Sequence, residues 1–345
     1  MDFEAELIQD IRAEKNVSLE RGLLIVSGLQ REREIERYSQ KLDRINRGFI
    51  ARLATKSPLS LASTRKHMTR TMAKWLFEYL WNTKPRRCDS NFLLTHVIDA
   101  QLDPDPKQKV GSCVGLTSLY TVLGLREGLN LAILVSGSHI INRLRIDGTD
   151  FCNIDNTDPL GFDCSINEEE FLEYPPIKLV ANVLNSRGMA WERVDNWARA
   201  REDYEKAIEA NLDYANAYNN RGNIKSKQGD YAGAIEDYDR AIYLDGKFVE
   251  AYSNRGMAKE NLGDLAEAVE DFNRVIEMNS EYSDAYFRRA HVKERLGDYT
   301  GALLDYDRVL EIDHESENKV MKFRDRAATL QKTRQRSSTK EFGRQ

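Results

Sequence analysis

Apolar side chains recur at helical spacing through the first part of the chain and then change to a strand-like pattern. Over residues 19–54 they recur at steps of three and four, which predicts helix; they are Leu23, Leu24, Val26, Leu29, Ile35, Tyr38, Leu42, Ile45, Phe49, Ile50 and Leu53. Similar spacing predicts helices near 60–81, where Trp75, Leu76, Tyr79 and Leu80 form a core cluster, and at 92–102 and 113–127.

Strand-type runs follow at 131–135, 138–146 and 149–155, and the Asp147-Gly148 pair between the last two is a hairpin signal. Residues 1–180 are therefore expected to form an α+β unit in which a helical region precedes the strands. Tyr174-Pro175-Pro176 ends this unit. No Gly/Ser-rich spacer follows, which predicts a short connection to the next part.

The second half is built from a repeat of 34 residues. The pairs Arg187-Gly188, Arg221-Gly222, Arg255-Gly256 and Arg289-Ala290 mark the period. Each clear unit has a Gly-Asp turn between two helical stretches, as at 229–230. One helix pair cannot bury its apolar face alone, so the units are expected to stack into a superhelix.

These units resemble the tetratricopeptide repeat. The resemblance covers 183–216, 217–250, 251–284 and 285–318, and implies an all-α superhelix that binds a protein or peptide partner. Residues 319–330 fit a capping helix, and the basic, Ser/Thr-rich stretch 331–345 is expected to be disordered.

The first helices of such repeats line a groove, and the resemblance places Asn219, Asn223, Asn254 and Arg288 there. Family members that hold a peptide carboxylate use lysines at two groove positions. Asn219 and Asp284 stand at those positions here, so much of the charge-assisted clamp is missing. The groove is expected to bind a protein or peptide by other contacts.

Three residues in the α+β unit form a candidate catalytic set. Cys113 opens a predicted helix, where the dipole and the free backbone N–H groups favour a thiolate. His139 lies near the start of the second predicted strand, and Asp155 ends the third. A cysteine nucleophile needs a base, and the base needs an orienting acid, so the set supplies all three roles.

Around these residues the sequence resembles the transglutaminase-like superfamily of papain-related folds. The resemblance rests on the order and spacing of four short motifs, Val110–Leu116, Ser118-Leu119-Tyr120, Gly137-Ser138-His139 and Ile154–Asp158. It implies a transglutaminase-like core with Cys113 as nucleophile, His139 as base and Asp155 as orienting acid. The superfamily includes thiol proteases, amidases, acyl transferases and members without known activity, so a non-catalytic scaffold is the alternative.

Two choices in the candidate set stay open. A three-residue loop centred on Asp147 would place His139 directly opposite Asp155, whereas a strict Asp147-Gly148 loop would place them on opposite faces of the sheet. The set therefore requires an odd loop or a bulge. Asp158 is the second choice for the acid, and Gln108 is a candidate oxyanion donor. Cys88, Cys152 and Cys164 are interpreted as structural or incidental.

Charge and composition limit the remaining classes. Residues 183–318 carry 18 basic and 29 acidic side chains, and residues 37–75 carry ten basic and one acidic. The basic residues of the second stretch alternate with apolar ones, which favours a solvated helix face over nucleic-acid binding. No apolar run is long enough for a membrane span. With no metal-ligand spacing or cofactor motif, the chain is expected to be a cytoplasmic protein that uses no cofactor. Its oligomeric state is left open.

Overall fold

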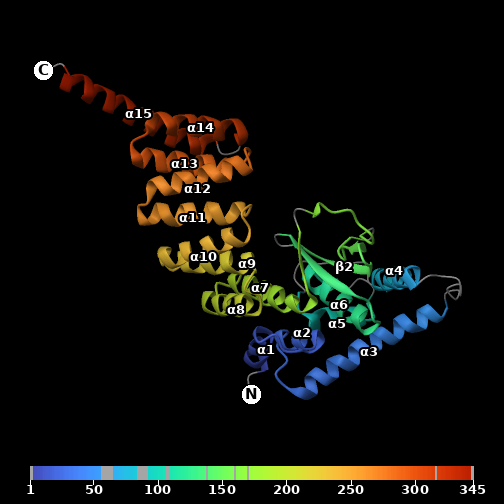
Figure 1. The fold of residues 1–345 in the computed structure, drawn as a ribbon. Helices are drawn as coiled ribbons and strands as arrows, with labels where there is room; N and C mark the ends of the chain where they lie inside the picture. The colour runs from blue at the N-terminus through green and yellow to red at the C-terminus, as the bar shows by residue number, and fades with distance from the viewer. Residues whose placement is uncertain are drawn as a thin grey trace. The chain divides into compact units, whose positions relative to one another are not determined.

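The chain folds into two compact units, Met1–Leu212 and Asp213–Gln345. The structure is a computed structural model, and it describes residues 3–55, 65–83, 92–105, 109–136, 139–158, 161–168, 171–314 and 317–342. Figure 1 shows a small sheet with helices in the first unit and a stack of helices in the second.

Helices dominate the beginning of the first unit. They are α1 (Phe3–Arg12), α2 (Leu19–Val26), α3 (Glu32–Ala54), α4 (Arg65–Thr83), α5 (Leu94–Leu102) and α6 (Cys113–Arg126). The stretch predicted as helical at 19–54 is two helices, because the chain turns at Gly28, whose φ of 98° few other residues adopt. The α1 helix was not predicted. Leu24, Leu42, Leu76 and Tyr120 are fully buried in the core.

An antiparallel sheet completes the α+β part. Its strands are β1 (Leu131–Ser136), β2 (His139–Asp147), β3 (Asp150–Ile154) and β4 (Leu172–Tyr174), in the order β3-β2-β1-β4. The three predicted strands are present, and β4 is an additional short edge strand. Both α4 and α6 pack against β2, so the helix that begins at Cys113 lies on the strand that begins at His139.

The first unit ends with a helix pair. After the short 3-10 helix η2 (Pro176–Lys178), α7 (Leu179–Glu192) packs against α8 (Trp197–Ala210). The α1 helix packs on α8, and α2 packs on α7. Arg187 on α7 pairs with Glu4 and Asp203, all three with little exposure. Most of the unit predicted at 183–216 therefore packs with the N-terminal part of the chain.

The second unit consists of helices that pack in chain order (Figure 1). They are α9 (Ala215–Lys227), α10 (Tyr231–Leu244), α11 (Val249–Leu262), α12 (Leu265–Met278), α13 (Ser283–Leu296), α14 (Tyr299–Ile312) and α15 (Glu317–Phe342). Val320 and Ala327 of α15 are buried in a cluster with residues of α13 and α14. This helix contains the predicted cap at 319–330 and continues through residues that were expected to be disordered.

Candidate active site and repeat array

Cys113 is the first residue of α6. Ser112 precedes it in an extended conformation, with φ −76° and ψ 175°, and makes no side-chain cap. The first helical hydrogen bond runs from the Leu116 N–H to the Ser112 carbonyl oxygen at 2.9 Å. The backbone N–H groups of Cys113 and the next residues thus have no acceptor within the helix, and the thiol lies at the positive end of the dipole.

Packing of α6 on β2 brings this helix end to the sheet. The buried Thr117 hydroxyl, one turn after Cys113, donates to the carbonyl oxygen of Ile140 at 3.2 Å. Tyr120, one turn further, donates to the Ala73 carbonyl at 2.9 Å and ties α6 to α4. Because Ile140 is next to His139, the same contact places Cys113 beside the imidazole, and a hydrogen bond joins their side chains.

His139 also meets Asp155. Its Nε2 lies 2.9 Å from Oδ2 of Asp155, and the two side chains are 40% and 21% exposed. Since Asp155 occupies Nε2, Nδ1 is the ring nitrogen left for the thiol. The structure therefore joins the three residues in the order Cys113, His139, Asp155. Of the two candidate acids, Asp155 is the one with a described hydrogen bond to the imidazole ring. Asp158 was the alternative.

The other carboxylate oxygen of Asp155 is held by the turn that follows. Oδ1 accepts hydrogen bonds from the Thr157 backbone N–H at 2.8 Å and from the Thr157 hydroxyl at 2.6 Å. The Asp155 N–H donates to the Gly161 carbonyl oxygen at 2.9 Å. A Cβ at position 161 would lie 2.2 Å from the Asp155 carbonyl oxygen, so this approach requires glycine.

A bulge puts His139 and Asp155 on one face of the sheet. Asn142 is opposite Ile154, but Asp147 is opposite Asp150, so the register shifts by one residue at Ile146. The turn is Gly148-Thr149, one residue later than predicted. Continuing the ladder places Asp155 opposite Ile141, two residues from His139 and on the same face. The three-residue loop that would place His139 directly opposite Asp155 is therefore not the one formed. Of the two alternatives, an odd loop or a bulge, the hairpin has the bulge.

These contacts shift the pKa values of both titratable partners. The hydrogen bond that His139 donates to Asp155, with a second one shared with Cys113, raises the pKa of His139 to about 10. Burial alone would raise the pKa of Asp155, but hydrogen bonds from His139 and Thr157 outweigh it and lower the pKa below its usual value. Both shifts favour an imidazolium held by a carboxylate, which is the form that stabilises a neighbouring thiolate.

A buried polar network behind the site was not predicted. Asn142 on β2 donates to the Thr121 hydroxyl of α6 at 2.7 Å and accepts from Asn156 at 2.8 Å. It links the helix of Cys113, the strand of His139 and the turn after Asp155. Asn142 is fully buried, and sequence pattern alone gives no sign of it. The sequence Asp155-Asn156-Thr157, by contrast, is a recognisable turn signal, and in this turn Thr157 donates hydrogen bonds to the Asp155 carboxylate.

The remaining sequence candidates fall into two groups. Gln108, Cys88, Gly137 and Ser138 lie outside the described residues. Cys152 is buried, and burial raises its pKa to about 12. Burial likewise raises the pKa of Cys164. These thiols are therefore poor nucleophiles near neutral pH.

Within the repeats, an arginine of each first helix pairs with an aspartate of the second helix. The pairs are Arg221–Asp237, Arg255–Asp271 and Arg289–Asp305, with N···O distances of 2.6, 2.5 and 2.6 Å. The α7–α8 pair makes the same contact through Arg187 and Asp203 at 2.6 Å. Each aspartate is nearly buried, so the bridge crosses the interior of the helix pair.

The residue after each arginine lies against an aromatic ring. A Cβ added to Gly222 would lie 2.7 Å from the Tyr238 ring, and one added to Gly256 would lie 3.0 Å from the Phe272 ring. Ala290 takes the corresponding place in the last unit, where Tyr306 is the buried aromatic. The 34-residue period of the sequence therefore corresponds to a close contact between two helices that recurs in each unit.

The predicted groove residues lie on the first helices, α9, α11 and α13, which contact one another in order. The Asn254 amide donates to Asn219 Oδ1 at 3.0 Å and links neighbouring units. Asn223 accepts from the Tyr238 hydroxyl at 2.8 Å, and Arg288 donates to Asp284 at 2.6 Å. These polar groups are thus positioned by neighbours in the array.

Family comparison identifies the class of the repeat array. Models of the tetratricopeptide repeat match residues 215–248 and 249–282, and a second such model matches 283–315. The C-terminal part of the chain is therefore a tetratricopeptide-repeat array, as predicted. The matches cover residues 215–315, and the resemblance of the N-terminal unit to the transglutaminase-like superfamily stays a prediction.

Two of the solved structures similar to the chain are tetratricopeptide-repeat (TPR) domains. The second TPR domain of human RPAP3, in complex with an HSP70 peptide, is 31% identical, with 32% of this chain and 92% of that chain covered at a TM-score of 0.31. The Arabidopsis OM64 TPR domain is 27% identical, with coverages of 33% and 95% and a TM-score of 0.33. MamA is 21% identical, with coverages of 44% and 88% and a TM-score of 0.39.

The chain has no significant match among curated proteins. In the described ranges, no helix is long and apolar enough to cross a membrane. In the same ranges, no three histidine, cysteine or carboxylate groups cluster in a way that could hold a metal ion.

Proposed function

We propose that this protein is a thiol enzyme that acts on amide bonds and carries a tetratricopeptide-repeat array for binding a protein or peptide. The observation that carries the proposal is the position of His139, which is hydrogen-bonded to Cys113 and lies 2.9 Å from Asp155. Nucleophile, base and orienting acid are arranged in the order that activated thiols require.

In this proposal, the Cys113 thiolate attacks the carbonyl carbon of an amide and forms a C–S bond. The backbone N–H groups at the start of α6, which have no acceptor within the helix, stabilise the oxyanion. The His139 imidazolium then gives its proton to the departing amine as the C–N bond breaks, which leaves a thioester. Water or a second amine, deprotonated by His139, attacks the thioester carbonyl, and the C–S bond breaks, which releases the acyl group and restores the thiolate and the imidazolium. Asp155 holds the ring in place throughout.

Thiol alkylation tests this assignment. The full chain is treated with limiting iodoacetamide near pH 6, and labelling of each cysteine is followed by peptide mass spectrometry. Cys113 should react at least about tenfold faster than Cys152 and Cys164, because only Cys113 is at a helix start and beside a histidine. The variant His139→Gln should slow labelling of Cys113, whereas the control His96→Gln, at an exposed position on α5, should not. Equal rates for all cysteines would contradict the proposal.

The second candidate function is a scaffold that has the fold but no turnover. It is supported by the family matches, which fall on the repeats at 215–315 and not on the part of the chain that contains Cys113. Photo-crosslinking probes the array directly: benzoylphenylalanine at position 288, on the proposed groove, should capture a partner, and the same group at Tyr243, an exposed site on the second helix α10, should not. Partner capture combined with an unreactive Cys113 would support the scaffold.

A further inference from the structure

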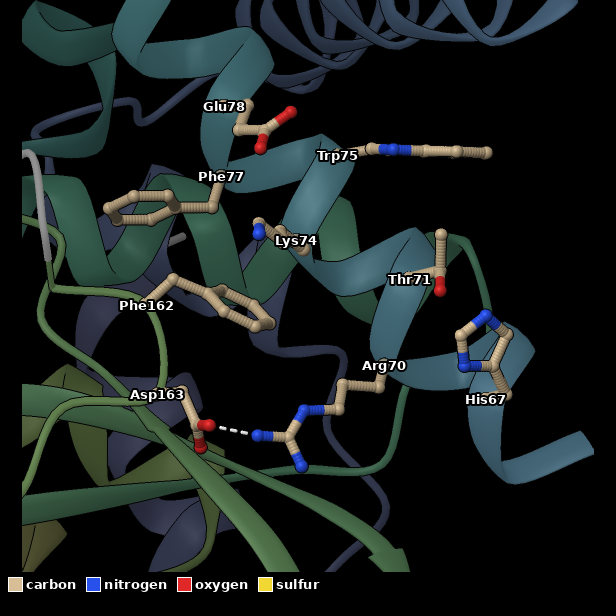
Figure 2. A pocket seen from close by; sticks show the side chains of 9 residues that line it. All are labelled: His67, Arg70, Thr71, Lys74, Trp75, Phe77, Glu78, Phe162 and Asp163. Carbon is tan, nitrogen blue, oxygen red and sulfur yellow. Dashed lines mark hydrogen bonds and ion pairs between the residues drawn. The ribbon is translucent and has the colours of Figure 1, made fainter. Parts of the chain in front are cut away.

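A pocket of about 770 Å³ lies between α4 and the segment that follows β3, outside the Cys113 site. Its lining comes from one face of α4 and from two residues of that segment (Figure 2): His67, Arg70, Thr71, Lys74, Trp75, Phe77, Glu78, Phe162 and Asp163. Its volume falls in the range of sites that hold small ligands.

The pocket combines an aromatic wall with charged groups of both signs. The rings of Phe77 and Phe162 are 6.0 Å apart at 53°, and they join the helix to the segment. Arg70 forms an ion pair with Asp163 (Figure 2). The Arg70 charge is therefore compensated within the pocket.

Lys74 is the cation left for a ligand. In Figure 2 its amine points into the space between Glu78 and Phe162. Among the described residues it has no hydrogen-bond or ion-pair partner, and its side chain is exposed. An ammonium beside aromatic rings attracts an anion more strongly than one in open water, because a ligand seated on the rings displaces solvent.

The pocket wall is also tied to the strand that leads to Asp155. Phe162 forms a bridge with Ile154, and the Gly161 carbonyl oxygen accepts the Asp155 N–H at 2.9 Å. These backbone contacts hold Phe162 in place against Phe77, so the aromatic wall is built before any ligand arrives.

We infer that this pocket binds a ligand in which an anionic group, a carboxylate or a phosphate, is attached to a planar apolar group. The anion pairs with Lys74, and the apolar group packs on Phe77 and Phe162. Binding at equilibrium does not involve the Cys113 sulfur, so this inference stands apart from the proposed thiol chemistry.

Three probes test the inference on the full chain by saturation-transfer NMR and calorimetry. N-acetylphenylalanine carries a carboxylate, phenyl phosphate carries a phosphate, and N-acetylphenylalaninamide is neutral. At least one anion should bind with a dissociation constant of about 1 mM or tighter, and the amide should bind about fivefold more weakly or worse. The tighter of the two anions identifies the anionic group. High salt should weaken anion binding.

Two variants should move the affinity in opposite directions. Lys74→Gln should weaken anion binding about fivefold, whereas Lys66→Gln, a control on the same helix whose lysine pairs with Asp150 outside the lining, should not. Asp163→Asn frees Arg70 and should tighten anion binding. Equal binding of the neutral amide, an unchanged affinity in Lys74→Gln, or no binding of any probe would overturn the inference.

Discussion

Nε2 of His139 and Oδ2 of Asp155 lie 2.9 Å apart, although sixteen positions separate the residues along the chain. The hairpin of β2 and β3 brings them to the same end of the sheet, and the one-residue bulge at Ile146 gives both the same face. Thr157 holds the second carboxylate oxygen, so Asp155 is fixed from both sides.

Replacing the carboxylate should lower the pKa of His139. Its value of about 10 depends first on the hydrogen bond that the ring donates to Asp155 and then on the one that it shares with Cys113. In Asp155→Asn the pKa should fall toward the ordinary value of about 6.5, and in Cys113→Ala it should fall less. Titration of the imidazole carbon resonances by NMR measures both. A wild-type His139 that titrates near 6.5 would show that these contacts do not form in solution.

The raised pKa of His139 also predicts how stability depends on pH. Because the folded pKa is about 10, the folded state holds the proton more tightly, and the contribution is complete below about 6.5 and lost as the pH rises toward 10. The stability difference between wild type and His139→Gln should therefore shrink over that interval. Its size should be on the order of 1 kcal/mol, since the ring is 40% exposed. Urea unfolding at several pH values measures it.

The lowered pKa of Asp155 acts in the opposite direction. Its contribution to stability is present above the unfolded pKa of about 3.9 and is lost as the pH falls through the lower folded pKa.

The His139→Gln experiment has one outcome that would contradict the assignment to His139. That outcome is a stability difference between wild type and His139→Gln that stays constant from pH 6 to 10.

Gly161→Ala should disturb the Asp155 end of the site. The new Cβ would lie 2.2 Å from the Asp155 carbonyl oxygen, so the backbone must move. We expect slower alkylation of Cys113 and a lower pKa of His139. Gly128→Ala is the control; its φ of 75° disfavours alanine, but no atom lies near the added Cβ. A reduced melting temperature in both variants, with slower alkylation in the Gly161 variant alone, is the expected pattern.

Removing one inner aspartate should destabilise the repeats strongly. Asp271 is nearly buried and accepts from Arg255 and Lys259. Asp271→Ala leaves these cations without their inner partner, which should cost about 3 kcal/mol. Glu277→Ala breaks the exposed pair with Arg274 and should change stability by at most about 0.5 kcal/mol. Chemical denaturation followed by circular dichroism compares them, and equal losses would refute the role of the inner bridge.

A methyl group at Gly222 should weaken the contact between α9 and α10. The added Cβ would lie 2.7 Å from the Tyr238 ring, and forcing the helices apart should cost about 1–3 kcal/mol. Gly246→Ala has no atom within 4 Å of the new Cβ and should be neutral or stabilising by about 0.5 kcal/mol. The order of their melting temperatures tests this; a Gly222 variant as stable as the Gly246 variant would mean that the helices can separate freely.

The local spacing of apolar residues was sufficient to predict most helices and strands, but it was insufficient to predict where each of them begins and ends. The 34-residue period predicted the helix pairs, because each arginine and glycine meets its partner within one unit. The pattern at 19–54 could not show the break at Gly28, since apolar residues continue on both sides. The edge strand β4 was missed because three residues carry no detectable alternation.

The sequence by itself determined the repeats, the order of most helices and strands, and Cys113 and His139 as candidates for the site, since spacing within one helix, hairpin or repeat follows from the backbone period. Only the tertiary structure decided that Asp155 rather than Asp158 meets His139, that Asn142 braces the site, and that Lys74 lines a pocket with Phe162. Those relationships depend on a one-residue bulge and on the packing of α4 and α6 against the sheet. Both are set by the sum of many weak contacts between segments distant in the chain.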